Sequence, residues 1–154
     1  MIDLPDSASE VVTEVRVKLF RTAVETGRVP QAPELSRALG RPESQVRAAL
    51  RQLAAARVVM LAPNDGEIWA ASPFCARPSG FRVSALGHVY WGICIWDALG
   101  IAAALDAATD ITTSCGDCGA SMRLQVRNGR LSHAEGVVHF AVPARRWWDN
   151  IGFT

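Results

Sequence analysis

The sequence lacks both a long apolar run and a strong net charge, and each absence excludes a class of protein. Among its 154 residues, 16 are Lys or Arg and 15 are Asp or Glu, which leaves a net charge of +1. No overall field therefore draws the chain to nucleic acid or to an anionic membrane. The longest apolar run, around Ile93–Leu105, is interrupted by Asp97 and is too short to cross a bilayer. The first residues lack the basic-then-apolar pattern of an export signal, so we expect a soluble cytoplasmic protein.

Cysteine and histidine are also scarce, with four and three residues respectively. In a reducing compartment the cysteines stay free, so they indicate chemistry, metal ligation or packing rather than a disulfide framework. A content of 49% hydrophobic and 20% charged residues is typical of a folded globular chain and not of a disordered one. A chain of this length forms one domain, or two small lobes that share a core.

Residues 1–71 carry the pattern of three helices followed by a β-hairpin. Apolar residues at helical spacing and glycine stops mark the helices, and the turn sequence Pro-Asn-Asp-Gly joins the two strands. The expected helices lie within 7–30, 32–40 and 41–59, and the expected strands are 58–62 and 67–71. This order predicts a winged-helix-like lobe.

A winged helix raises the possibility of DNA binding through its third helix. The candidate contacts are Arg41, Gln45, Arg47 and Arg51. Glu43 stands among these arginines and dilutes the positive charge. The alternative is that this lobe packs against another part of the protein and reads no sequence, because a fold alone does not assign a function.

Residues 72–80 form a Pro/Gly/Ser-rich connector, and residues 81–154 predict a second lobe of strands around one buried helix. The strands are expected at 81–85, 109–115, 120–129 and 136–142, and the helix from about Gly92 to Ala107. A short helix after Pro143 is expected to be held on the sheet by Trp147 and Trp148. The fold class is therefore α+β, with a three-helix winged-helix-like lobe before a mixed or antiparallel sheet lobe.

The stretch "YWGICIWDALG" places Cys94 three residues before Asp97 in apolar surroundings. On one helix this spacing puts both side chains on the same face. In the first helical turn, unpaired amides and the helix dipole would favour a thiolate. A soft thiolate beside a carboxyl group suits the capture of a soft metal and the transfer of a proton.

Four motifs occur in the order "ASPFCARPSGFRVS", "YWGICIWDALG", "TTSCGDCGASMRLQV" and "VPARRWWDNIGFT". In this order and spacing the chain resembles the alkylmercury (organomercurial) lyase family, most strongly from Ser72 to Phe153. The resemblance implies that residues 81–154 are a catalytic lobe that cleaves a carbon–mercury bond by protonolysis. It makes Cys94 the mercury-binding thiolate and Asp97 the proton donor.

The resemblance also implies partners. The substrate is a small organometallic compound, Hg(II) is the bound product, external thiols carry it away, and no organic cofactor is needed. The family pattern continues past "WWDNIGFT" into a second cysteine, whereas this chain ends at Thr154. The expectation is that the sequence is clipped just before this residue or lacks it.

Cys115 and Cys118 form a C-G-D-C motif that is half of a zinc site, without a second pair to complete it. They are read as soft-metal ligands or as a reduced pair in a tight strand connection. Two functions outside lyase chemistry stay open. One is a non-enzymatic soft-metal-binding or sensor protein using Cys94, Cys115 and Cys118. The other is a relative that uses the Cys94–Asp97 pair on a different small substrate.

Overall fold

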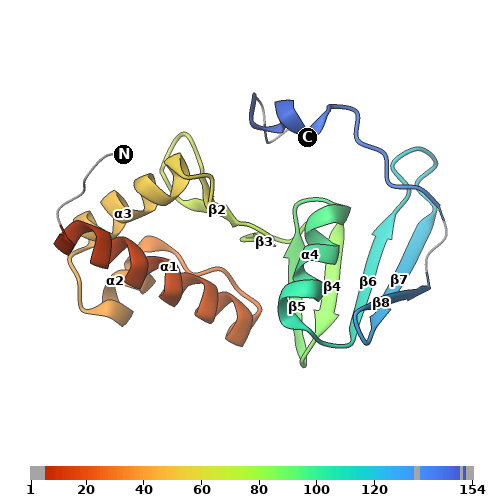
Figure 1. The fold of residues 1–154 in the computed structure, drawn as a ribbon, viewed down its shortest axis with the longest axis horizontal. Helices are drawn as coiled ribbons and strands as arrows, with labels where there is room; N and C mark the ends of the chain where they lie inside the picture. The colour runs from red at the N-terminus through yellow and green to blue at the C-terminus, as the bar shows by residue number, and fades with distance from the viewer. Residues whose placement is uncertain (1–5, 134–135, 150, 152–154) are drawn as a thin grey trace.

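The structure is a computed structural model that describes residues 6–133, 136–149 and 151. Its first part contains three helices and a small antiparallel sheet (Figure 1). These elements are α1 (Asp6–Thr26), α2 (Ala32–Leu39), α3 (Glu43–Ala55), β1 (Val59–Leu61), β2 (Ile68–Ala71) and β3 (Phe74–Cys75). The strand order β1-β2-β3 places the hairpin of β1 and β2 beside the chain that leads into the second lobe.

Amphipathic spacing and one glutamine side chain explain this lobe. Val15, Leu19 and Ala23 recur every four residues on α1 and are buried, as a helix with one apolar face requires. Gln31, just before α2, donates from its Nε2 to the Ile68 carbonyl and accepts the Ile68 N–H at Oε1 (2.9 and 2.7 Å). Its amide thereby pairs with β2 as a neighbouring strand would, and ties the helices to the hairpin.

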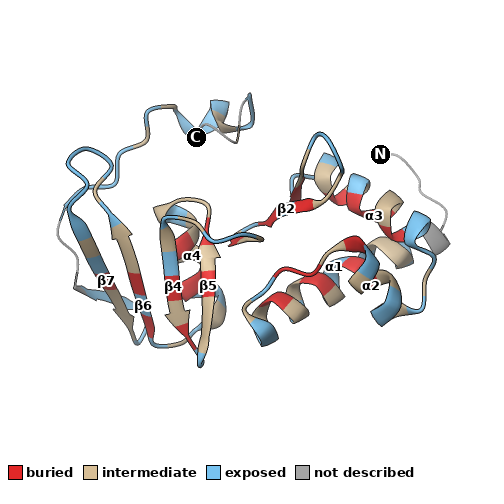
Figure 2. Cartoon of the chain, turned by 180° about the vertical axis from the view of Figure 1, so that it is seen from behind, coloured by how far each residue is buried: buried red, intermediate tan, exposed pale blue. Residues whose placement is uncertain are grey.

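The second part is a five-stranded antiparallel sheet with one helix packed on it (Figures 1 and 2). The strand order is β5-β4-β6-β7-β8. The elements are β4 (Phe81–Ala85), β5 (His88–Gly92), α4 (Ile95–Leu105), β6 (Thr109–Ser114), β7 (Ser121–Arg127), β8 (Arg130–His133) and the 3₁₀ helix η1 (Ala144–Asp149). Helix α4 buries Ala98, Ile101 and Ala102 against β4, β5 and β6. The predicted α+β class is confirmed, and the sheet is antiparallel throughout.

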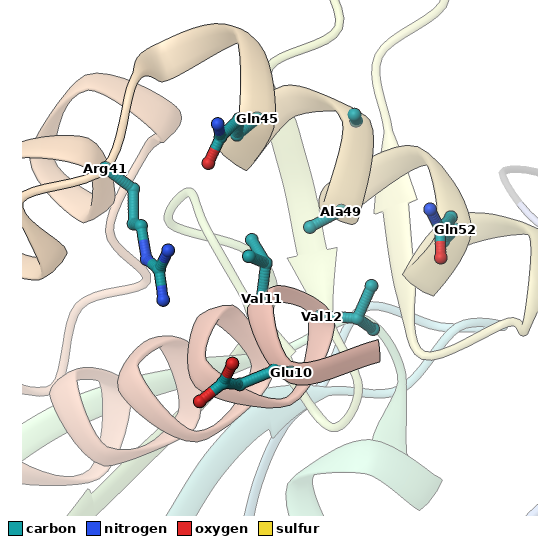
Figure 3. A pocket seen from close by; sticks show the side chains of 8 residues that line it. Glu10, Val11, Val12, Arg41, Gln45, Ala49 and Gln52 are labelled. Atoms are coloured by element: carbon teal, nitrogen blue, oxygen red, sulfur yellow. The ribbon is translucent and has the colours of Figure 1, made fainter. Parts of the chain in front are cut away.

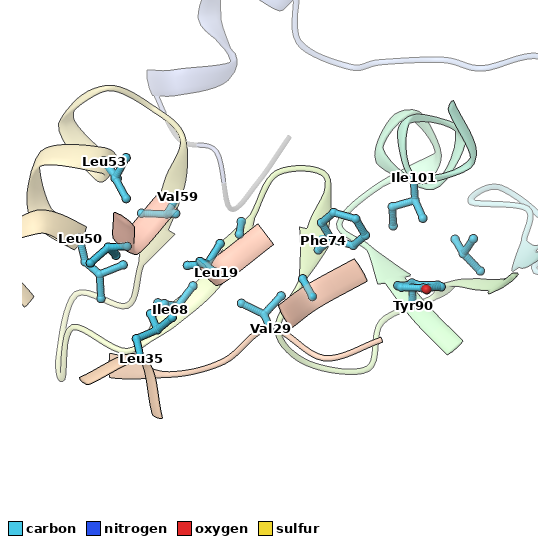
Figure 4. Packing of buried hydrophobic residues seen from close by; sticks show 14 of the residues in the cluster. Leu19, Val29, Leu35, Leu50, Leu53, Val59, Ile68, Phe74, Tyr90 and Ile101 are labelled. Carbon is cyan, nitrogen blue, oxygen red and sulfur yellow. The ribbon is translucent and has the colours of Figure 1, made fainter. Parts of the chain in front are cut away.

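One hydrophobic core runs through both parts, so the connector crosses a packed interface (Figure 4). The rings of Phe74 and Tyr90 lie 5.8 Å apart between the helical lobe and the sheet. The Tyr90 hydroxyl donates a hydrogen bond to the Val24 carbonyl of α1 at 2.8 Å. A Cβ built on Gly27 would lie 2.6 Å from the Val89 carbonyl, so only glycine permits this close approach of the lobes. The division of the chain at residues 72–80 stays a prediction.

Two predicted elements are wrong in detail. Residues 136–142 form no strand, and β8 at Arg130–His133 takes the place beside β7 instead. The cause is the turn at Asn128 and Gly129, whose positive φ values of 52° and 68° return the chain at once. Helix α4 begins at Ile95 and not near Gly92, because residues 88–92 are strand β5.

Among the described residues, no helix is long and apolar enough to cross a membrane.

Candidate functional site

The structure brings Cys94 and Asp97 together at the start of α4. Cys94 is the N-cap residue, with extended backbone angles (φ −139°, ψ −179°), and Asp97 is the third residue of the helix. The Cys94 thiol donates a hydrogen bond to Asp97 Oδ2, with sulfur and oxygen 3.5 Å apart. The predicted juxtaposition on one helical turn is therefore confirmed.

Gly92 and Ser79, which sequence reasoning missed, set the path of the chain into this turn. A Cβ on Gly92 would lie 2.8 Å from the Ala98 nitrogen and 3.0 Å from the Cys94 carbonyl, so the first turn of α4 rests directly on the end of β5. Ser79 Oγ donates to the Gly92 carbonyl at 2.6 Å and accepts the Phe81 N–H at 3.1 Å. A glycine between an apolar strand and an apolar helix was the available signal for Gly92. The sequence carries none for Ser79.

Burial controls the electrostatics of the pair. Burial raises the pKa of the Asp97 carboxyl, although the Cys94 thiol and the backbone N–H groups of Ile93 and Cys94 favour its ionised form. Burial also raises the pKa of the Cys94 thiol, and the neighbouring carboxylate adds to this effect. The N–H groups of Trp96 and Asp97 oppose it more weakly. Burial therefore works against the expected thiolate at Cys94, because desolvation outweighs the N–H groups of the helix terminus.

An apolar groove of about 670 Å³ lies beside the first turn of α4. Trp96, 61% exposed, forms one side, and residues 140–144 with Trp147 form the other. The Phe140 and Trp147 rings lie 4.8 Å apart, and Trp147 Nε1 donates to the Val142 carbonyl at 2.8 Å. Through Trp96, the groove adjoins the helical turn that also carries the thiol and the carboxyl.

The segment that forms the groove returns toward the helical lobe (Figure 1). Trp148 lies under the Arg57 guanidinium, whose central carbon is 5.2 Å from the ring centroid. Arg57 follows α3, so the expectation that Trp148 holds η1 on the sheet is wrong. A cation–π contact of this kind between the two lobes contributes about 0.5–1 kcal/mol at an exposed position.

Cys115 and Cys118 lie in the turn between β6 and β7. The Cys115 N–H donates to the Ala120 carbonyl at 2.8 Å, and the Gly119 N–H donates to the Cys115 carbonyl at 2.9 Å. Hydrogen bonds from the N–H groups of Cys118 and Asp117 lower the pKa of the Cys115 thiol. Among the described residues, no three His, Cys, Asp or Glu side chains group as a metal site. Cys94 and the two turn cysteines are thus not joined in one coordination site.

Another cavity lies elsewhere, between α1 and α3 (Figure 3). Val11 and Val12 of α1 and Gln45 and Ala49 of α3 line this space of about 320 Å³. Its lining includes no cysteine or histidine and is remote in sequence from α4. This cavity offers no thiol or imidazole as a nucleophile, so Cys94 and Asp97 remain the candidate site.

The face considered for DNA binding is largely neutralised. Arg41 pairs with Glu14 at 2.9 Å, and Arg47 pairs with Glu43 at 2.7 Å and with Glu67 at 3.3 Å. An arginine held by a carboxylate must break that pair before it contacts a phosphate, which weakens the electrostatic attraction on which DNA binding depends. The geometry thus disfavours the DNA-binding alternative.

Comparisons with known proteins agree with the motifs. The model of the MerB family, alkylmercury lyase, matches residues 74–154. The fold is similar to that in a crystal structure of the mercury-bound form of MerB2, with a TM-score of 0.62 and 24% sequence identity. The similarity covers 85% of this chain and 61% of that one, so the chain spans less than two thirds of the protein it resembles. No curated protein matches the sequence.

Proposed function

Because the chain belongs to the alkylmercury lyase family, we propose that it cleaves a carbon–mercury bond by protonolysis at Cys94 and Asp97. The observation that carries the proposal is the 3.5 Å hydrogen bond from the Cys94 thiol to Asp97 Oδ2. It joins a sulfur that binds soft metals to a carboxyl that can hold a proton.

In the first step the sulfur of Cys94 displaces the leaving group X from an organomercurial R–Hg–X. A mercury–sulfur bond forms, the mercury–X bond breaks, and the thiol proton passes to Asp97 Oδ2, its hydrogen-bond acceptor. A neutral thiol suits this step, because the proton needed later is brought to the site by the residue that binds the metal. The raised pKa of Asp97 favours the protonated carboxyl that results.

In the second step Asp97 donates this proton to the carbon bound to mercury. The carbon–mercury electron pair forms the new C–H bond, RH leaves, and Hg(II) stays on Cys94 until an external thiol supplies another sulfur. A positioned acid of this kind accelerates a reaction by about 10²–10⁴-fold. The apolar groove that Trp96 lines on the same turn of α4 offers apolar surface for the organic group R.

The direct test is benzene release from a phenylmercury salt in the presence of excess thiol, measured by gas chromatography. We expect release by the protein, abolition in Cys94→Ser, and a loss of about 10²–10⁴-fold in Asp97→Asn. Cys75→Ser and Asp106→Asn are the matched controls, because Cys75 lies on β3 and the exposed Asp106 lies at the other end of α4. Equal release by Asp97→Asn and the protein would contradict the role of the carboxyl.

A second candidate function is soft-metal binding without cleavage, and the C-G-D-C turn favours it. That turn offers two sulfurs in addition to Cys94, and Cys118 is exposed to solvent. In this case mercury would bind to the protein while phenylmercury stayed intact. Mass spectrometry of the protein after incubation with phenylmercury separates the two functions, since a bound phenylmercury adduct indicates binding and bound Hg(II) alone indicates cleavage.

A further inference from the structure

The turn between β6 and β7 contains two cysteines, Cys115 and Cys118, three residues apart. Gly119, with φ +72°, closes the turn through its N–H to the Cys115 carbonyl, and Cys115 and Ala120 continue the strand pairing below it. The Gly119 N–H bond to the Cys115 carbonyl folds residues 115–119 into one tight turn that carries both cysteines, and the Cys118 thiol is near enough to Cys115 to help lower the pKa of the Cys115 thiol after the backbone N–H groups of Cys118 and Asp117. The hydrogen-bonded turn thus places the two sulfurs within interaction range of each other.

The turn offers two protein sulfurs and no third ligand. Within the described part of the chain, no His, Cys, Asp or Glu joins the pair to make a group of three. A structural zinc ion takes four protein ligands in a tetrahedron, so the turn is a poor zinc site. Two thiols suit a thiophilic ion that is satisfied by two sulfurs, of which Hg(II) is the relevant example here.

The turn also lies at the same end of the sheet as Cys94 (Figure 1). Gly92 pairs with Phe81, and the register of β4 with β6 places Thr113 level with Phe81 on the other side. Gly92 and Thr113 are therefore two strand spacings apart, or about 10 Å. Cys94 and Cys115 each lie two residues beyond those positions, so both cysteines lie past the same end of the sheet.

From this placement we propose that Cys115 and Cys118 form a second, independent site that chelates Hg(II) through both sulfurs. Binding is ligand exchange without redox change: with HgCl₂, two mercury–chloride bonds and two S–H bonds break, two mercury–sulfur bonds form, and two chloride ions and two protons go to solvent. That the turn receives the Hg(II) left on Cys94 after cleavage rests on the proposed lyase function. The chelation itself does not, because it uses neither Cys94 nor Asp97.

The test uses HgCl₂ with the full chain carrying Cys94→Ser, which removes the sulfur of the proposed lyase site. The reduced protein is titrated in the presence of a competing monothiol and followed by mercury–thiolate ultraviolet absorption and native mass spectrometry. We expect one Hg(II) per chain to be retained. Adding Cys118→Ser should weaken retention by about 10²–10⁴-fold, the gain expected when a second ligand is held on the same short segment.

Cys94→Ser with Cys75→Ser is the matched control and should retain the ion, because Cys75 lies on β3 with its sulfur directed to the Trp69 carbonyl at 3.9 Å. The side chain of Cys118 is exposed, so its replacement leaves the fold intact, and circular dichroism checks this. Equal Hg(II) retention with and without Cys118, or no retention by the Cys94→Ser protein, would overturn the proposal. Zn(II) held as firmly as Hg(II) would overturn the two-ligand argument. Since the parent variant has no Cys94, failure here is separate from failure of benzene release.

Discussion

Replacing Gly92 with alanine tests whether the close approach of β5 and α4 holds the reactive pair in place. The added Cβ would lie 2.8 Å from the Ala98 nitrogen and 3.2 Å from the Ala98 Cα. Both atoms belong to the backbone, so no side chain can rotate away and the first turn of α4 must move. The Cys94–Asp97 hydrogen bond lies in that turn and would move with it.

Two opposing energies decide the effect on stability. An alanine restricts the unfolded chain and stabilises a compatible site by about 0.4–1 kcal/mol. Overpacking a closed site costs about 1–3 kcal/mol. The clash dominates, which gives a net loss of about 1–2 kcal/mol and a melting temperature lower by about 2–8 °C for a chain of this size. A misplacement of about 1 Å can lower a reaction rate about 10²-fold, so benzene release should fall far more than stability suggests.

Gly80→Ala is the matched control, since a Cβ there meets nothing within 4 Å. It should keep both the melting temperature and the rate, or gain slightly in stability. Differential scanning fluorimetry and the benzene assay measure the two quantities on the same preparations. If Gly92→Ala matches Gly80→Ala in both, the contact between β5 and α4 does not position the site.

Three further predictions concern charge, packing and partners. Burial raises the pKa of Asp97 above its usual 3.8, so its contribution to stability is complete below that pH and is lost as pH rises through the folded value. Asp97→Asn should therefore gain stability over the unmodified protein toward neutral pH and not at pH 3, as urea unfolding across this range will show; a gain equal at every pH would contradict the burial argument. Tyr90→Phe removes the hydrogen bond to the Val24 carbonyl and should lower the free energy of unfolding by about 1–2 kcal/mol. An unchanged urea unfolding curve would contradict this prediction. Because Arg41 and Arg47 are paired with carboxylates, we expect no mobility shift of duplex DNA at low salt, and a salt-dependent shift would restore the sensor alternative.

The features that depend on local spacing could be predicted from the sequence. The interval of three residues placed Cys94 and Asp97 on one turn, and the glycine and proline signals marked the helices of the first lobe. The ion pair of Glu43 with Arg47 also follows from a spacing of four residues. Such features need only the geometry of a single element.

The features that depend on distant partners could not be predicted in the same way. Glu14 neutralises Arg41 from 27 residues away, and no local pattern indicates this. The apolar alternation of residues 136–142 favoured a strand, yet the turn at Asn128 and Gly129 gives its place to the polar segment of β8. The raised pKa of the Cys94 thiol follows from its burial in the fold, which a helix-dipole argument leaves out.

The hydrogen bond from the Tyr90 hydroxyl to the Val24 carbonyl of α1 bears on any truncation that keeps only the second lobe. A fragment starting at residue 72 would keep the thiol and the acid but expose Phe74 and Tyr90, which are 4% and 1% accessible in the intact chain. Such a fragment should aggregate on expression, because a large apolar face would lose its cover. The helices of the N-terminal lobe thus cover and support the part of the chain that carries Cys94 and Asp97, whether or not these helices bind a partner.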